Sequence, residues 1–314
     1  MQFFDMIINS ILISASFIMY FCIFNILYPK IFLNLSSIKG SGFISSIIIF
    51  VYFFFLNNNI FGSESIYFAI IIVLSVIYFY DDVFGLNILS RIIIQFLSGI
   101  ICAYLFLDIS DQYLIIKLLI FGCWTIFFVN CLNFYDGEDL NFSILIILIL
   151  VINCLLLVND NTFFLTLIVI LFFIIFSFFN IYLKEFYFGD SGCFAIACFL
   201  NYLLITSMET NFENLFVFLA PLFLPILDVI YVIILRLYLK ENLTTRNYYH
   251  LYQRLAKKYK KYYYLLPTII MTLTFILYYF IYKYLDINII YLYMIAFITL
   301  VISYFLTIYI LRRL

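Results

Sequence analysis

Charged residues are scarce in this chain of 314 residues. Only 11% of the residues are Asp, Glu, Lys or Arg, whereas 68% are hydrophobic. The residues that interrupt helices are also few, with 9 glycines and 4 prolines, and there is a single histidine. So low a content of charge excludes an ordinary soluble globular protein. The sequence is therefore that of an integral membrane protein.

Three further patterns are missing. The seven cysteines lack the paired spacing of a metal site, so we interpret them as small buried hydrophobic residues in a reduced setting. The alternating segments of about ten residues that build a transmembrane barrel are absent. There is also no internal repeat or low-complexity linker, so we treat residues 1–314 as one domain.

Long apolar runs recur along the chain, and a helix of about 20 such residues crosses roughly 30 Å of hydrocarbon. The first run is too long for a removed signal peptide and lacks the cleavage pattern, so we expect it to remain as a helix. The predicted fold class is all-α, a polytopic membrane protein with about eleven transmembrane helices. The predicted spans are 4–28, 43–57, 65–80, 88–107, 113–130, 141–158, 162–181, 193–208, 214–236, 264–283 and 288–310.

Basic residues gather in alternate loops of this topology. One side carries Lys30, Lys39, Arg91, Lys184, the basic stretch 236–261, Arg312 and Arg313. The other side carries mostly acids, namely Glu64, Asp108, Asp111, Asp160, Glu209, Glu213 and Asp286. The positive-inside rule places the basic side and the carboxyl terminus in the cytoplasm. Three acidic motifs fall on that same side, so we expect them to share one aqueous site.

The first motif, Tyr80-Asp81-Asp82-Val83-Phe84-Gly85-Leu86, follows the third span. Charges are costly inside a bilayer, so Asp81 and Asp82 are expected to face water or protein. They can hold a divalent ion, or one can act as a base while the other orients it. Arg91, nine residues beyond Asp82, can grip a phosphate. The alternatives are a polar stop to the span and an ordinary positive-inside anchor.

The second motif runs from Asn130 to Asp139 and packs three acids and two amides into ten residues. Gly137 lets the backbone turn or approach a ligand closely. Asn133 offers an uncharged oxygen to a hard cation. The alternative is a solvated loop between helices.

The third motif is Phe188-Gly189-Asp190-Ser191-Gly192, immediately before an apolar helix. Backbone N–H groups at a helix start can cradle phosphate, and Asp190 can hold Mg²⁺ beside it. A plain turn is the alternative.

The basic loop 237–263 contains the only histidine, in His250-Leu251-Tyr252-Gln253-Arg254-Leu255. Its lysines, arginines and tyrosines suit a phosphate-attracting surface near the headgroups. An amphipathic interfacial helix that only touches anionic lipid is the alternative.

Together and in this order, the motifs resemble the polyprenyl-phosphate N-acetylhexosamine-1-phosphate transferase family, within glycosyltransferase family 4. This family includes the phospho-N-acetylmuramoyl-pentapeptide transferases and the enzymes that start O-antigen and teichoic acid synthesis. Residues 80–95 are similar to its aspartate-pair motif, residues 133–139 to its Asn-Phe-Met-Asp-Gly-Ile-Asp loop and residues 188–192 to its Gly-Asp-x-Gly loop. The histidine loop resembles that of the O-antigen-initiating branch.

The resemblance implies a Mg²⁺-dependent transfer, with Mn²⁺ as an alternative ion, of a sugar 1-phosphate from a UDP-sugar to a polyprenyl phosphate, with release of UMP. By position, Asn133 and Asp190 would hold the metal, and Asp81 and Asp82 would position or deprotonate the lipid phosphate. The substrate-binding set would be Arg91 at a phosphate, Asp139 at the uracil, His250 and Arg254 over the sugar phosphate, and Asp136 and Gly189 beside them.

The same resemblance implies a multi-pass protein of the bacterial inner membrane with cytoplasmic active-site loops. The expected partners are the UDP-sugar, the polyprenyl phosphate and the membrane, with a homodimer left open and no nucleic acid. Two alternatives remain open. A polytopic ion-coupled transporter would place acids within its spans, and Asp228 is the nearest example. A catalytically silent family member is favoured by the first loop, where only Ser36-Ser37-Ile38-Lys39-Gly40-Ser41-Gly42 stands in place of the family's longer motif.

Overall fold

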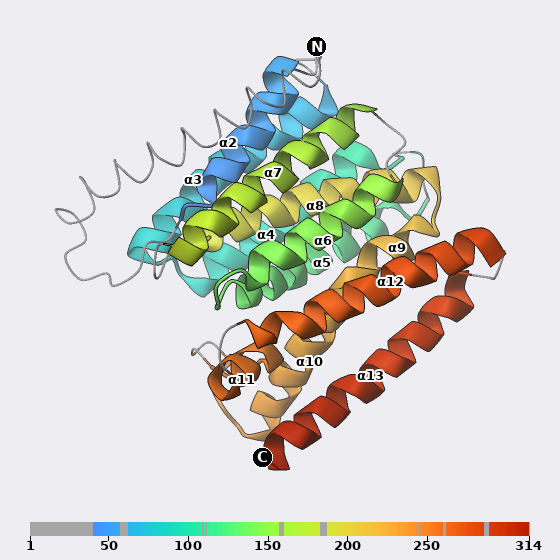
Figure 1. The fold of residues 1–314 in the computed structure, drawn as a ribbon. Coiled ribbons are helices and arrows are strands. Elements are labelled where there is room, and N and C mark those ends of the chain that lie inside the picture. The colour runs from blue at the N-terminus through green and yellow to red at the C-terminus, as the bar shows by residue number, and fades with distance from the viewer. Residues whose placement is uncertain are drawn as a thin grey trace.

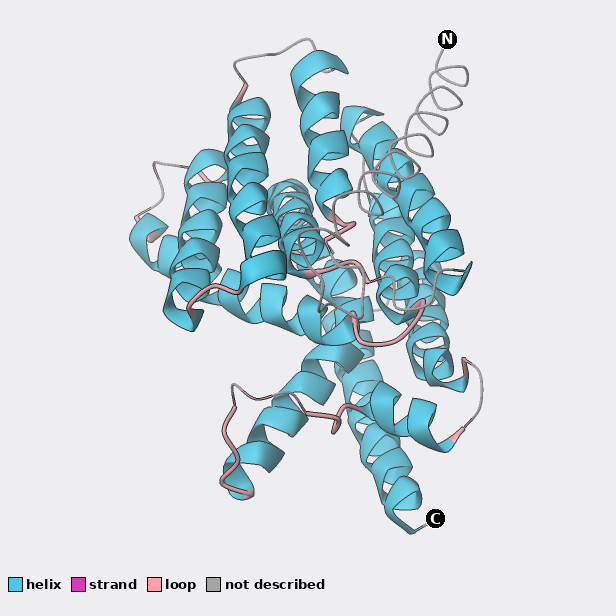
Figure 2. Cartoon of the chain, turned by 90° about the vertical axis from the view of Figure 1, so that its left-hand side faces the viewer, coloured by secondary structure: helices cyan, strands magenta, loops and turns pink. Residues whose placement is uncertain are grey.

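Helices build the whole described part of the chain, with no strand among those residues (Figures 1 and 2). The computed structural model describes residues 40–56, 62–108, 110, 112–156, 160–182, 187–243, 245, 247–259, 262–285 and 289–313. The predicted first span, 4–28, lies outside them. The all-α prediction is confirmed for the described residues.

The helices follow one another with short connections. They are α2 (Phe43–Val51), α3 (Ser63–Phe84), α4 (Ile88–Phe106), α5 (Leu114–Tyr135), α6 (Asn141–Leu156), α7 (Asp160–Tyr182), α8 (Asp190–Thr210), α9 (Asn214–Leu219), α10 (Phe223–Tyr238), α11 (Leu251–Lys258), α12 (Leu266–Leu285) and α13 (Ile289–Arg313). A π-helical turn, Tyr52–Leu56, extends α2, and 3-10 turns at Ala220–Leu222 and Tyr263–Leu265 precede α10 and α12.

Six of these segments are long and apolar enough to cross a membrane. They are Ser63–Phe84, Ile88–Phe106, Leu114–Tyr135, Thr162–Tyr182, Asp190–Thr210 and Asn214–Tyr238. Shorter apolar helices among the described residues correspond to four more of the predicted spans, at Phe43–Phe54, Asn141–Leu155, Tyr263–Thr274 and Met294–Tyr309. The protein is thus polytopic, and the count of eleven spans stays a prediction.

Helix α8 is the central element of the bundle formed by α2–α8 (Figure 1). It packs against α2, α3, α4 and α5, and it is the most deeply buried of the six spanning segments. Its first half carries small residues, including Gly192, Cys193, Ala195 and Ala197, all buried. Small side chains let neighbouring helices approach closely inside a membrane. The start of α8 is therefore fixed within the protein.

The carboxyl-terminal helices form a second packing region. Helices α10–α13 share an apolar core that includes Leu251, Leu255 and Tyr304 and that also takes in residues of α6 and α9. The predicted span 214–236 is interrupted between α9 and α10 by the 3-10 turn, with Pro221 and Pro225 near the break. A cavity of about 770 Å³ lies among α10, α11, α12 and α13, lined mostly by apolar side chains.

The ends of three helices extend beyond the predicted spans. Asp81 and Asp82 lie in the last turn of α3, not after it, and Asn133 lies in the last turn of α5. Asp190 is the first residue of α8. A drop in hydropathy marks the edge of the bilayer, whereas a helix continues as long as its backbone hydrogen bonds are made.

Candidate active site

The first turn of α8 is capped by a residue from another helix. Gly189 stands at the N-cap position and has no side chain to accept the free N–H groups. The Asp82 carboxylate accepts from the Asp190 N–H at 2.8 Å, from the Ser191 N–H at 3.1 Å and from the Ser191 hydroxyl at 2.7 Å. Asp82 therefore fixes the position of Asp190.

Asp136 holds the preceding residues of the same loop. Its carboxylate accepts from the backbone N–H of Phe188 at 3.3 Å and of Gly189 at 2.9 Å. Burial raises the pKa of Asp136 to about 7, against the opposing effect of these two hydrogen bonds, and the nearby negative charges of Asp190 and Asp82 add to the rise. A cation bound in this cluster would favour the ionised form. The second and third motifs thus meet directly.

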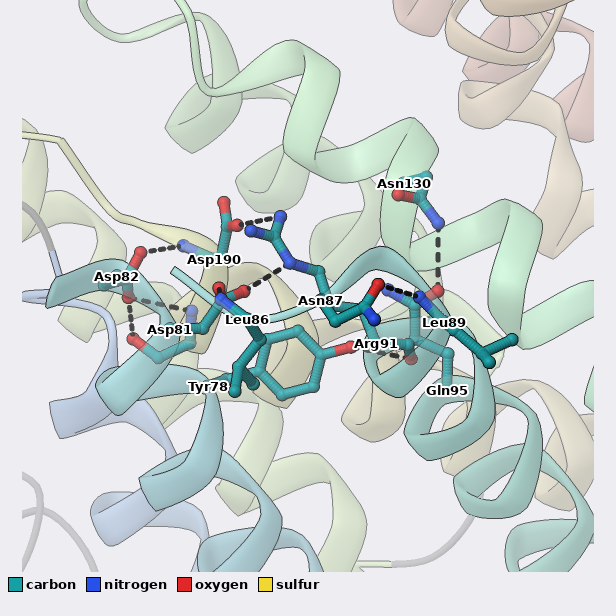
Figure 3. A network of polar contacts seen from close by, with 11 residues as sticks. Tyr78, Asp81, Asp82, Leu86, Asn87, Leu89, Arg91, Gln95, Asn130 and Asp190 are labelled. Atoms are coloured by element: carbon teal, nitrogen blue, oxygen red, sulfur yellow. Dashed lines mark hydrogen bonds and ion pairs between the residues drawn. The ribbon is translucent and has the colours of Figure 1, made fainter. Parts of the chain in front are cut away.

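Arg91 joins the first motif to the third (Figure 3). Its Nε lies 2.8 Å from Asp81 Oδ2, and its Nη1 lies 3.2 Å from Asp190 Oδ2. The Asp81 side chain is fully buried, whereas those of Arg91 and Asp190 remain 34% and 26% exposed. The guanidinium is therefore engaged by two carboxylates while one edge of the cluster stays open to a ligand.

Hydrogen bonds between α3, α4 and α5 brace this arrangement (Figure 3). The Tyr78 hydroxyl donates to the Arg91 carbonyl oxygen at 3.1 Å, and the Tyr78 ring stacks on Phe194 of α8. Gln95 accepts from Asn130 at 3.0 Å. These contacts fix the start of α4, and with it the backbone that carries Arg91.

Glycines allow residues 40–42, before α2, to reach the same place. The Gly42 N–H donates to the Phe188 carbonyl at 2.9 Å, and the Ser41 hydroxyl donates to the Tyr187 carbonyl at 3.0 Å. Gly189 has φ +87°, and a Cβ there would overlap the Gly40 backbone and lie 2.9 Å from Asp82 Oδ2. The remnant Gly40-Ser41-Gly42 is thus packed into the site.

The rest of the second motif lies at the edge of the cluster. The Asn133 carbonyl accepts from the Asp136 N–H at 3.2 Å, and its side chain is half-buried. The Asp139 carbonyl accepts from the Tyr264 hydroxyl at 2.7 Å. Partial burial raises the pKa of the Asp139 carboxyl above its usual value. The predicted roles of Asn133 at the metal and Asp139 at the uracil remain untested by these contacts.

His250 approaches the second motif from the other packing region. It is the N-cap residue of α11 and is 2% exposed, and its ring lies 5.3 Å from that of Phe134. The Tyr252 hydroxyl donates to the Phe134 carbonyl, and the Tyr252 ring lies 5.3 Å from the Tyr135 ring. The structure therefore brings His250 beside the second motif, and its predicted role over the sugar phosphate stays a prediction.

The basic loop has a partly structural role. Arg236 is buried and donates to the carbonyls of Asn242, Leu243 and Thr245, which orders the chain after α10. Arg254 is half-buried, and its guanidinium lies 5.8 Å from the Tyr249 ring centroid. Lys257 and Lys258 are exposed, whereas Arg246, Lys260 and Lys261 lie outside the described residues. The predicted role of Arg254 at the sugar phosphate is not tested by these contacts.

The donor set suits a hard cation. Within the described ranges, no group of three or more His, Cys, Asp or Glu side chains is arranged to hold a metal ion. Mg²⁺ commonly uses only one or two carboxylates and completes its shell with water and substrate phosphates. Asp190, whose partly exposed carboxylate pairs with Arg91 at one oxygen, fits that requirement.

Several site residues escape sequence reasoning. Ser191 and the glycines of the first loop contact the cluster, yet the motif comparison marks that loop only as shortened. Asp228 of α10 contacts His250, and Tyr304 of α13 contacts Asp228. The signal for Asp228 is an acid within an apolar span, and no sequence signal marks Tyr304.

A comparison with protein families gives a match to part of the chain. Residues 65–208 match the model of glycosyl transferase family 4. The predicted family is thereby confirmed over the segment that holds the three acidic motifs, from Asp81 to Asp190, and its branch is not distinguished. His250 and Arg254 lie beyond the matched segment. No curated protein matches the chain.

Proposed function

Taking the family 4 match over residues 65–208 as the premise, we propose that this protein transfers an N-acetylhexosamine 1-phosphate from a UDP-sugar to a polyprenyl phosphate. Undecaprenyl phosphate is the proposed acceptor and UMP the product released. The reaction would begin a cell-envelope glycan at the cytoplasmic face of a bacterial inner membrane. O-antigen initiation is the proposed branch, because the His250 loop resembles that branch.

One observation carries the proposal. Three acidic motifs and residues 40–42 converge on the first turn of α8, where Asp82 and Asp136 hold the backbone and Arg91 pairs with Asp190. A pyrophosphate bound there would meet a guanidinium and a carboxylate that can hold a cation. This set of groups suits phosphate chemistry better than ion transport.

The proposed step is a displacement at phosphorus. An oxygen of the polyprenyl phosphate attacks the phosphorus attached to the sugar, and the bond from that phosphorus to the UMP oxygen breaks. Such transfers require charge neutralisation and in-line placement more than covalent help. Mg²⁺ held by Asp190 and Asn133 would supply charge neutralisation. Arg91 would exchange a carboxylate partner for a phosphate oxygen.

Asp81 and Asp82 would act on the acceptor side. In the structure Asp82 holds α8 and Asp81 pairs with Arg91, so their first effect is to position Asp190 and the guanidinium. Either carboxylate can also take the remaining proton of the lipid phosphate as the complex forms. His250 and Arg254 would close over the sugar phosphate.

The lipid chain needs an apolar path beside this polar cluster. The cavity of about 770 Å³ among α10–α13 is lined by Leu251 and Leu255 of α11, next to His250. Exposed Lys258 lies over the ring of Tyr259, which also lines it. We propose that this cavity accommodates part of the polyprenyl chain, with its phosphate toward α11.

The transporter alternative rests on Asp228, the acid within a span. Its carboxylate is occupied by three donors from α11 and α13 and is fully buried, which favours a fixed partner over a passing ion.

The deciding experiment is UMP release by purified protein in detergent, with a panel of UDP-N-acetylhexosamines and undecaprenyl phosphate. We expect release with one or more sugars, dependent on both the lipid phosphate and Mg²⁺. Asp190→Asn serves as the inactive control. No release with any sugar, from protein that stays monodisperse and folded, would reject the transferase in favour of a silent family member.

A further inference from the structure

The only histidine of the chain is held by a buried aspartate from another helix. His250 Nδ1 lies 2.8 Å from Asp228 Oδ2. The other carboxylate oxygen, Asp228 Oδ1, accepts from the Leu251 N–H at 2.9 Å and from the Tyr304 hydroxyl at 2.7 Å. Asp228, His250 and Tyr304 are 0%, 2% and 2% exposed. Their contacts join α10, the start of α11 and α13.

All of these partners donate to the carboxylate. A backbone N–H and the hydroxyl that points at Oδ1 are donors, and an ionised carboxylate can only accept. Nδ1 of His250 must therefore carry the hydrogen that faces Oδ2. In a neutral ring this leaves Nε2 as an acceptor, and on protonation it becomes a donor.

Nε2 is the nitrogen left for chemistry. It is buried and has no hydrogen-bond partner among the described residues. Burying a polar atom without a partner is costly unless a ligand completes it. His250 Nε2 is thus available to a group that the described residues do not supply, beside Phe134 of the second motif.

We propose that Asp228 is a positioning residue, completed by Tyr304, that keeps the hydrogen of His250 on Nδ1 and so presents Nε2 as an acceptor to a phosphate oxygen of the substrate that carries a hydrogen. This inference rests on the proposed function for the identity of the ligand. The tautomer itself depends only on the geometry. Asp228 acts through His250, and Tyr304 acts through Asp228.

Asp228→Asn tests directly whether Asp228 keeps the hydrogen of His250 on Nδ1. Two donors, Leu251 N–H and the Tyr304 hydroxyl, need the oxygen at the Oδ1 position, so the new amide NH₂ must take the Oδ2 position and face Nδ1. A donor would then meet a donor. The hydrogen on His250 must move from Nδ1 to Nε2, which turns the free nitrogen from acceptor to donor.

Because the chain has one histidine, ¹⁵N-histidine labelling yields a single imidazole signal pair without assignment. The full chain in detergent, purified through a histidine-free tag, should carry hydrogen on Nδ1, whether or not Nε2 is protonated too. Asp228→Asn should move the neutral ring to the Nε2–H form. Hydrogen on Nε2 alone in the wild type, or an unchanged spectrum in the variant, overturns the proposal.

Kinetics supply the second arm. We expect Asp228→Asn and His250→Ala each to lower kcat of UMP release by about 10²-fold with KM for the UDP-sugar changed less than about threefold, as for other lost acid–base partners. The double variant should be no slower than His250→Ala, because the two residues act as one unit. Additive losses contradict the proposal.

Tyr304→Phe is a milder variant that tests the same unit if Asp228→Asn does not fold. It removes one hydroxyl, and we expect kcat to fall by about threefold to tenfold, the size of one lost hydrogen bond. Tyr291→Phe, on the same helix with a 66% exposed side chain, is its control and should match wild type. Equal rates for both variants would remove Tyr304 from the unit. A wild type with the predicted tautomer but no transferase activity would reject the proposed function and retain the positioning role.

Discussion

The acidic cluster and the histidine unit of this protein are stabilised in different ways. At the cluster, Asp82 and Asp136 accept from backbone N–H groups, and glycines of two loops pack backbone on backbone. At the histidine unit, three side chains from α10, α11 and α13 satisfy one another in the core. The cluster keeps a partly open edge, whereas the histidine unit is almost completely buried.

This difference decides what each region tolerates. A cluster built on backbone contacts depends on glycine and on helix ends, and its exposed side chains are available for ligands. A unit built on side-chain contacts depends on the identity of each partner. Removing an exposed side chain of the cluster that could bind a ligand should therefore lower activity. Removing a supporting contact should disturb the geometry of whichever region contains it.

The largest effect is expected at the exposed carboxylate. Asp190→Asn should lower UMP release by about 10³-fold or more, because an amide is a poorer Mg²⁺ ligand than a carboxylate. Folding should be retained, since the backbone N–H of this residue still donates to Asp82. The assay is initial rate against Mg²⁺ concentration. Asp108→Asn, at an exposed loop residue, is the control. Near-wild-type rates for Asp190→Asn would show that the third motif is only a turn and binds no metal.

Glycine substitutions test the close backbone packing. Gly189→Ala should lower the free energy of unfolding by about 3 kcal/mol, from backbone strain together with overlap on the first loop. Gly85→Ala is the matched control, because Gly85 also has positive φ, +76°, but no atom within 4 Å of an added Cβ. We expect about 1 kcal/mol there. Melting temperatures in detergent would compare them, and equal shifts would contradict the packing of the two loops.

Asp82→Asn tests whether Asp82 positions the site or is only a polar residue at the end of α3. Activity should fall by about 10²-fold. Because the carboxylate caps α8, the variant should also lose about 1–2 kcal/mol of stability, the cost of a lost helix cap. Asp81→Asn should instead act through Arg91, its only charged partner among the described residues. Normal UMP release by both variants would reject the assignment of these residues to the site.

The smallest effect concerns the contact between the regions. Tyr264→Phe removes the hydroxyl that donates to the Asp139 carbonyl, at a cost of about 1 kcal/mol. The loosened loop should raise KM for the UDP-sugar severalfold, if Asp139 meets the uracil. Tyr263→Phe, at a residue 57% exposed, should do neither. A change in kcat without a change in KM would place Asp139 away from the nucleotide.

The sequence predicts the first region well because its motifs are short. Asp81, Asp136 and Asp190 each stand next to a glycine or at the end of an apolar run, and the structure brings the motifs that hold them into contact. The helices extend several residues beyond the predicted spans, since a polar residue can continue a helix after the apolar run has ended.

The second region required the structure. Asp228 and Tyr304 are 76 residues apart, and neither position carries a local signal for their contact. The glycines of the first loop are similar, because only the three-dimensional packing reveals that they touch Gly189 and Gly192. Long-range contacts between single residues are set by helix packing, which a lone sequence does not display.

The capping of α8 also has a consequence for synthesis. Gly40, Asp82 and Asp136, which contact residues 188–191, all precede α8 in the chain. As the ribosome inserts the protein from its amino end, the acidic cluster can close once residues 188–192 arrive. Tyr304 follows Asp228 by 76 residues, so the histidine unit is completed only much later in translation.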